Sequence, residues 1–99
     1  KMWTETADGK VSSKTVIMKN IESVLPDNVE KIWKEDLKQY YVEYESGSST
    51  KKMWIEDLQS IKEKVSLVNK YNLAGVAAWE KDQEKDEVWQ VIKETLQEK

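Results

Sequence analysis

The chain contains no cysteine and no histidine. Without cysteine it can form no disulfide, no thiolate nucleophile and no cysteine metal site. Without histidine it lacks the commonest general base, the commonest metal ligand and every histidine-dependent catalytic triad. Acid–base chemistry would therefore fall to Asp, Glu, Lys or Tyr. The sequence indicates neither a metal site nor a cofactor.

Basic patches and long apolar runs are also missing. The net charge is −3, the sequence pI is about 5.1, and the lysines are scattered among glutamates. No basic stripe is available to displace counterions from a phosphate backbone, so nucleic acid is not an expected partner. No apolar run approaches the roughly 20 residues of a membrane span, so no membrane partner is expected. The acidic stretch 80–87 lacks the glycine and spacing of a calcium loop and is typical of a solvated loop.

The composition is that of a short globular protein with an unusual set of aromatic residues. Its 99 residues, 38% hydrophobic and 35% charged, suit one small folded domain. Five Trp and four Tyr stand beside no Phe. Aromatic rings with a polar edge suit partly wet groove walls, although Trp also fills ordinary cores.

The N-terminal half predicts two helices followed by a hairpin. The first helix is expected from a cap at Ser12 or Ser13 to Leu25, before Pro26. The second is expected from a cap at Asp27 or Asn28 to Leu37. Alternation then predicts that strands 40–45 and 51–56 pair across a turn at 46–49.

The C-terminal half predicts a βαβα pattern. Asp57 is a natural cap for a helix that ends at Tyr71–Asn72, and Asp86 opens a last helix. Between them, residues 73–79 are apolar without alternation, which is typical of a strand covered on both faces in a parallel sheet or barrel. Such a strand needs neighbours that this chain does not contain. The chain, which starts at Lys1, is therefore expected to be the closing piece of a larger parallel α/β enzyme.

Two segments resemble glycoside hydrolase family 18, in its bacterial cell-wall and spore-cortex branch. They are Trp54–Ser60 followed by Lys64, and Leu67–Trp79. The resemblance implies an α/β fold, α+β in its N-terminal half: a partial TIM barrel that carries its α+β insertion domain. Residues 1–11 would be the end of barrel strand six and a linker, 12–50 the insertion domain, and 51–99 the last two βα units.

The resemblance also implies a function. Family members hydrolyse β-1,4 bonds next to N-acetylglucosamine, with the substrate's own acetamido oxygen as nucleophile. A glutamate that closes an Asp-x-x-Asp-x-Asp-x-Glu run serves as the general acid. No such run occurs in this chain, so no catalytic residue is assigned, and whether the segment belongs to an active enzyme is left open. The implied partner is an N-acetylglucosamine-containing glycan, in an extracytoplasmic, cell-surface or spore-envelope setting.

Three aromatic residues are candidate substrate contacts. By resemblance, Trp79 forms the floor of the subsite for the reacting sugar, and its alternative is a core residue at a strand end. Trp3 and Tyr44 are weaker candidates: Trp3 lacks the expected Arg two positions before it, and Tyr44 could equally pack within the hairpin. Trp33, Trp54 and Trp89 are expected to be packing residues. Asp57 is expected to be a helix cap rather than half of a catalytic pair with Glu56.

A second function from another class stays open. The chain could be a non-catalytic sugar-binding or protein-interaction module. Strands with unpaired edges would then favour self-association into a homo-oligomer.

Overall fold

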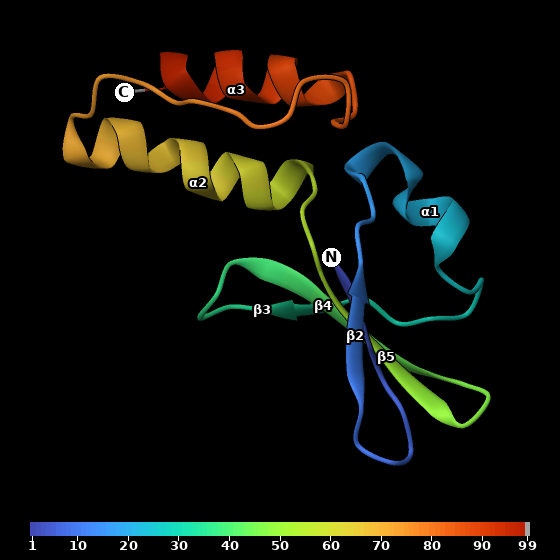
Figure 1. The fold of residues 1–99 in the computed structure, drawn as a ribbon. Helices are drawn as coiled ribbons and strands as arrows, with labels where there is room; N and C mark the ends of the chain where they lie inside the picture. The colour runs from blue at the N-terminus through green and yellow to red at the C-terminus, as the bar shows by residue number, and fades with distance from the viewer. Residues whose placement is uncertain (99) are drawn as a thin grey trace.

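A five-stranded sheet lies beside two packed helices, with short helical turns above the sheet (Figure 1). The computed structural model describes residues 1–98. The elements in chain order are β1 (Met2–Glu5), β2 (Val11–Lys14), the 3-10 helix η1 (Met18–Asn20), α1 (Ile21–Val24), β3 (Ile32–Lys34), β4 (Gln39–Ser46), β5 (Ser49–Ile55), α2 (Leu58–Tyr71) and α3 (Glu87–Gln97).

The sheet has the strand order β2-β1-β5-β4-β3, and every neighbouring pair is antiparallel. The fold is therefore α+β. The expected parallel strands of a partial TIM barrel do not occur among residues 1–98: β5 does precede a helix, but both its neighbours run antiparallel to it. The prediction of two βα units rested on a parallel crossover that this sheet does not make.

The predicted hairpin is confirmed as β4 and β5, which pair from Tyr40 opposite Ile55 to Ser46 opposite Ser49. Val42 lies opposite Met53, and the two side chains are 0% and 2% exposed. Side chains alternate across a strand, so this pair fixes which residues face the core. We call the side of the sheet that carries Val42 and Met53 the inner face, and the opposite side the outer face.

The core forms where η1, α1 and the chain after them cover the inner face. It consists of buried apolar residues from both layers: Met2, Ile21, Leu25, Val42, Met53 and Ile55. Several half-buried apolar side chains pack around this cluster, among them Met18, Tyr40 and Tyr44. The apolar residues of the first half thus form the core, although they belong to other secondary-structure elements than predicted.

The predicted helix from Ser12 or Ser13 to Leu25 is wrong over most of its length. Residues 11–14 form β2, which returns along β1 after a turn in which Gly9 has φ 87°. The Thr6 amide donates to the Lys10 carbonyl at 2.9 Å and closes this turn. Only residues 21–24 are α-helical. The β-branched residues between Val11 and Ile17 favour extended backbone, and hairpin pairing outweighs their partly helical spacing.

The second predicted helix, from Asp27 or Asn28 to Leu37, is also wrong. Residues 32–34 form β3, which pairs with β4. The Trp33 ring meets the Tyr40 ring edge-on with centroids 5.0 Å apart. A turn follows, in which Lys38 has φ 52°. Spacings of three and four residues had indicated a helix, but cross-strand aromatic packing decides the conformation here.

Helix α2 confirms the prediction for residues 58–71, and Asp57 is its N-cap. The Asp57 carboxylate accepts a hydrogen bond from the Ser60 amide at 2.9 Å, and the Ser60 hydroxyl accepts one from the Asp57 amide at 2.9 Å. This reciprocal pair is a capping box, which satisfies two backbone donors at the helix start. At the other end Asn72 is left-handed, with φ 54°. The cap ties the start of α2 to the end of β5.

Helix α3 packs along α2, as Figure 1 shows. Val65 and Val68 of α2 are buried, as are Val88 and Thr95 of α3. The Asn69 side-chain amide donates to the Thr95 carbonyl at 2.9 Å and so caps the end of α3. The predicted helix after Asp86 is confirmed. Trp89, which was expected to face inward, is instead 49% exposed.

The strand predicted at residues 73–79 is not formed. These residues lie between α2 and α3 outside any strand or helix, and Leu73 and Val76 are 53% and 44% exposed. The Trp79–Glu80 peptide bond is cis. The apolar run predicted a strand between two neighbours, whereas the five strands formed by residues 1–98 pair with one another elsewhere. No helix among the described residues is long and apolar enough to span a membrane.

The capping box gives a test of the β5–α2 connection. Ser60→Ala removes a fully buried hydroxyl that accepts from the Asp57 amide and donates to the Glu56 carboxylate, so we expect the free energy of unfolding to fall by about 1–2 kcal/mol. Urea unfolding followed by circular dichroism measures this change. Ser66→Ala is the matched control: the Ser66 hydroxyl only donates to a carbonyl in its own helix, so stability should change by less than about 0.5 kcal/mol. Equal losses in the two variants would contradict the capping role.

Candidate functional site

A pocket of about 320 Å³ lies where residues 76–81 cross the α2–α3 pair. Its walls are largely apolar side chains of the helices and of the crossing segment, with several charged groups at the rim. The lining residues on which the argument depends are Glu56, Lys64, Val76, Trp79, Glu84 and Trp89. An apolar hollow with a few polar groups is the usual form of a small-molecule site.

Trp79 is the most exposed large side chain of the site. It is 93% exposed, although it lines the pocket. An indole that packs against almost nothing in its own chain leaves both faces free to contact a ligand. Within the described residues, Trp79 is not part of a buried core.

Glu56 supplies a carboxylate between the sheet and α2. It follows the last residue of β5, accepts a hydrogen bond from the Ser60 hydroxyl and forms an ion pair with Lys64. The carboxylate is therefore held by a buried serine and by a cation one turn further along the helix. Because these partners already hold the Glu56 carboxylate in place, the side chain loses little conformational entropy when it binds a ligand.

Trp89 lies across the same pocket, on α3. Its indole Nε1 donates to Glu84 Oε1 at 2.9 Å. The Glu84 carboxylate accepts from its own backbone amide and then from Trp89, and these hydrogen bonds hold the pKa of Glu84 below its usual range. Glu84 therefore stays charged at neutral pH, and it fixes the Trp89 ring at the pocket rim.

A second hollow of about 330 Å³ lies between α1 and the start of α2. Tyr40 and Gln59 form one wall, where the Tyr40 hydroxyl donates to Gln59 Oε1 at 3.2 Å. Glu22 is paired with Lys31 at another side, and that hydrogen bond lowers the pKa of Glu22. Glu56 lines both hollows, so a single carboxylate faces two adjoining spaces.

The structure does not bring the three predicted site residues together. Trp79 lies beside the helix pair, while Trp3 lies on β1 on the outer face and is 45% exposed. Tyr44 lies on the inner face, packs against the core and directs its hydroxyl to Met2 Sδ at 3.3 Å. Neither Trp3 nor Tyr44 lines the pocket beside Trp79. Their predicted sugar contacts would have to be made elsewhere.

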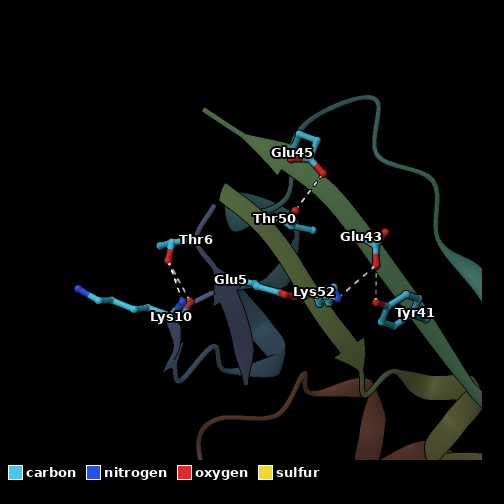
Figure 2. A network of polar contacts seen from close by, with 8 residues as sticks. All are labelled: Glu5, Thr6, Lys10, Tyr41, Glu43, Glu45, Thr50 and Lys52. Carbon is cyan, nitrogen blue, oxygen red and sulfur yellow. Dashed lines mark hydrogen bonds and ion pairs between the residues drawn. The ribbon is translucent and has the colours of Figure 1, made fainter. Parts of the chain in front are cut away.

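Sequence reasoning missed the exposure of Trp54 on the outer face. Trp54, expected to be a packing residue, is 42% exposed and lies opposite Tyr41, with ring centroids 4.5 Å apart. Figure 2 shows the polar part of this face, where Lys52 lies between Glu5 and Glu43. The alternation of Trp54 with Met53 and Ile55 contained the signal, because alternate residues of a half-buried strand face solvent.

The described residues contain no group of three or more acidic side chains placed to hold a metal ion. The acidic stretch 80–87 accordingly forms no such cluster. Its backbone forms hydrogen bonds within the loop and to η1. The Gln83 backbone amide donates to the Glu80 carbonyl, and the Gln83 carbonyl accepts from the Lys19 backbone amide at 3.2 Å. The second contact connects this loop to η1.

Comparison with known proteins identifies one informative likeness. No family model matches the sequence, and no curated protein matches it. The structure is similar to the crystal structure of a chitinase from Chromobacterium violaceum ATCC 12472, with a TM-score of 0.81 and 20% sequence identity. The match covers 99% of this chain and 31% of the chitinase chain. This chain thus spans about a third of that protein and has the fold of a part of a chitinase.

Proposed function

We propose that this chain is a segment of a chitinase-like glycosidase of family 18 and binds an N-acetylglucosamine-containing glycan at Trp79. The observation that carries the proposal is the pocket beside Trp79, because a 93% exposed indole borders an apolar hollow in a fold shared with part of a chitinase. The CH-rich face of a pyranose ring is apolar and stacks on a flat aromatic side chain.

The polar groups of the pocket suit the rest of the sugar. Hydroxyl and acetamido groups need hydrogen-bond partners when they leave water. The Glu56 carboxylate can accept from a hydroxyl or an amide N–H, and Lys64 can donate. Trp89 adds a second aromatic surface across the hollow. The site is thus equipped to bind one or two sugar units, which is the contribution we assign to it.

The proposal also assigns residues 73–79 to a barrel. We infer that this apolar segment is a strand in the whole protein, and that the antiparallel sheet formed by β1 to β5 lies outside the barrel. The exposed Leu73 and Val76 support this inference, because a flanking strand would cover them. An extracytoplasmic, cell-surface or spore-envelope location is part of the same proposal, since glycans of this class lie outside the membrane.

A non-catalytic interaction module remains the second candidate. The strands β2 and β3 are the two edges of the sheet and have few residues, which favours weak pairing with another chain. We expect the purified chain to sediment as a monomer at low concentration and to self-associate only weakly as the concentration rises. A stable dimer that binds no glycan would favour the interaction module over the glycosidase segment.

The Trp79 contact is tested by titration with hexa-N-acetylchitohexaose followed by isothermal calorimetry. We expect Trp79→Ala to weaken binding roughly tenfold or more, because it removes the largest exposed contact surface of the site. Tyr71→Ala is the control, since Tyr71 is 62% exposed and lies outside the pocket, so binding should stay unchanged. Unchanged affinity in Trp79→Ala would remove the basis for the site.

Catalysis is tested with a chromogenic chito-oligosaccharide. We expect residues 1–99 to release no chromophore, because the sequence lacks the Asp-x-x-Asp-x-Asp-x-Glu run that carries the general acid. Glu56→Gln serves as the diagnostic variant, since Glu56 is the pocket carboxylate held by a buried serine and a lysine. Turnover that disappears in Glu56→Gln would move the catalytic acid into this chain.

A further inference from the structure

The outer face of the sheet carries an exposed apolar strip. Ile32 of β3 lies opposite Tyr41 of β4, and Tyr41 lies opposite Trp54 of β5. Trp3 of β1 lies opposite Lys52, two positions before Trp54, and so extends the row diagonally. The exposed fractions of Ile32, Trp54 and Trp3 are 43%, 42% and 45%. These three residues and Tyr41 come from four neighbouring strands, and we call them the apolar strip.

Acidic side chains border the strip on the side of the β4–β5 turn. Here Glu43 lies opposite Lys52, while Glu45 and Glu5 both lie opposite Thr50, one on each neighbouring strand. Lys52 Nζ is 3.1 Å from Glu5 Oε2 and 4.0 Å from Glu43 Oε1 (Figure 2). Glu45 accepts from the Thr50 hydroxyl at 3.0 Å, and no ion pair joins it to another residue in the range 1–98. Three carboxylates thus share one lysine, and this acidic flank has a net negative charge.

The opposite border of the strip carries a cation. Lys34 of β3 lies on the outer face two positions after Ile32, and its Nζ is 5.8 Å from the centre of the Tyr41 ring. A positive charge over an aromatic ring is attracted by the quadrupole of the ring. The charge on the outer face therefore changes from negative to positive across the strip, which gives a partner one preferred orientation.

This order of groups is that of a protein interface. Such interfaces have an aromatic centre depleted of charge and a polar rim that stays in contact with water. The strip supplies two indoles and a phenol, and Trp and Tyr are among the side chains that dominate binding energy. The ion pairs of Lys52 lie on the flank, where the side chains of Lys52, Glu5 and Glu43 are 40%, 49% and 52% exposed. A partner can therefore cover the rings without removing the water around these charges.

The size and charge of this surface decide which partner fits. Four strands about 4.8 Å apart, over the length from Thr50 to Trp54, give an area of roughly 14 Å by 13 Å. A stable dimer buries about 800 Å² on each copy, and a second copy would also bring a further net charge of −3. A short segment with arginine or lysine beside apolar side chains matches both the area and the charge. Arginine suits the position because its planar guanidinium pairs with carboxylates and stacks on indole.

We propose that the apolar strip and its acidic flank form a docking surface for a short basic and apolar polypeptide segment of another protein. The apolar side chains of the segment cover Trp3 and Trp54, and its cation pairs with Glu45, the carboxylate that Lys52 does not reach. The surface shares no residue with the pocket beside Trp79. The inference therefore goes beyond the proposed function and does not depend on glycan binding.

The test uses a synthetic peptide of leucines followed by arginines, with analogues in which glutamate replaces arginine or serine replaces leucine. In ¹⁵N–¹H spectra each of the five indole N–H groups gives its own signal, which single Trp→Phe variants assign. We expect the Trp3 and Trp54 signals to move with the leucine–arginine peptide, and affinity to fall at least tenfold for both analogues. Binding should also weaken as NaCl is raised, since the carboxylates are exposed. Trp33 is the internal control, because it packs edge-on against Tyr40 on the inner face.

Two variants with matched controls supply the second measurement. Trp54→Ala should weaken binding of the leucine–arginine peptide roughly tenfold, whereas Leu67→Ala, which removes a residue of α2 that is 42% exposed, should change nothing. Glu45→Gln should weaken binding several-fold by removing the carboxylate outside the Lys52 ion pairs. Glu94→Gln removes one exposed carboxylate from α3, away from the sheet, so it controls for net charge and should leave affinity unchanged.

Each remaining outcome overturns the inference. Equal binding of the glutamate analogue excludes a basic partner, and movement confined to Trp79 and Trp89 places the peptide in the other pocket. If hexa-N-acetylchitohexaose moves the Trp3 and Trp54 signals, the surface binds glycan. If these signals shift with protein concentration alone, a second copy occupies the face. If no signal moves, the docking surface does not exist. The proposed function is tested separately by the Trp79→Ala calorimetry.

Discussion

The pairing of Met53 with Met2 on one side and Val42 on the other determines the rest of the sheet. All three side chains are buried, and they come from the three central strands. A shift of one residue in β5 would move Met53 to solvent and bring Lys52 and Trp54 into the core. The register is therefore strongly specified. Its consequence is an outer face on which ionic and aromatic groups must lie together.

The connection between sheet and helices depends on two consecutive residues after β5. Asp57 caps α2, while Glu56 reaches Ser60 and Lys64 of the same helix. The capping box sets the direction in which α2 leaves the sheet, and α3 follows α2 through buried valines and the Asn69 cap. The pocket beside Trp79 lies against both helices. The end of β5, which is far from Trp79 in the sequence, thus determines the geometry of the pocket.

Sequence patterns predicted the elements whose signals were local and redundant. For β4 and β5, alternation and a serine-glycine turn agree, and for α2 an N-cap and a helical apolar stripe agree. The predictions failed where one pattern fits two structures. Ile32 and Trp33 suited a helix face, but Trp33 gains more from Tyr40 across the strands. Trp79 was chosen as a candidate ligand contact because the resemblance singled it out, whereas composition gave no means of telling that Trp54 would be exposed.

The absence of a strand at residues 73–79 affects the structure of the pocket beside Trp79. The segment is apolar and exposed, and it also forms one wall of the pocket. Exposed apolar side chains gain about 25 cal/mol per Å² when covered, so a neighbouring strand would draw this segment into register. The same event would order the backbone that carries Trp79. Since ordering a contact before binding removes part of its entropic cost, Trp79 held in a completed strand would lose less entropy on binding a sugar than it does in this chain.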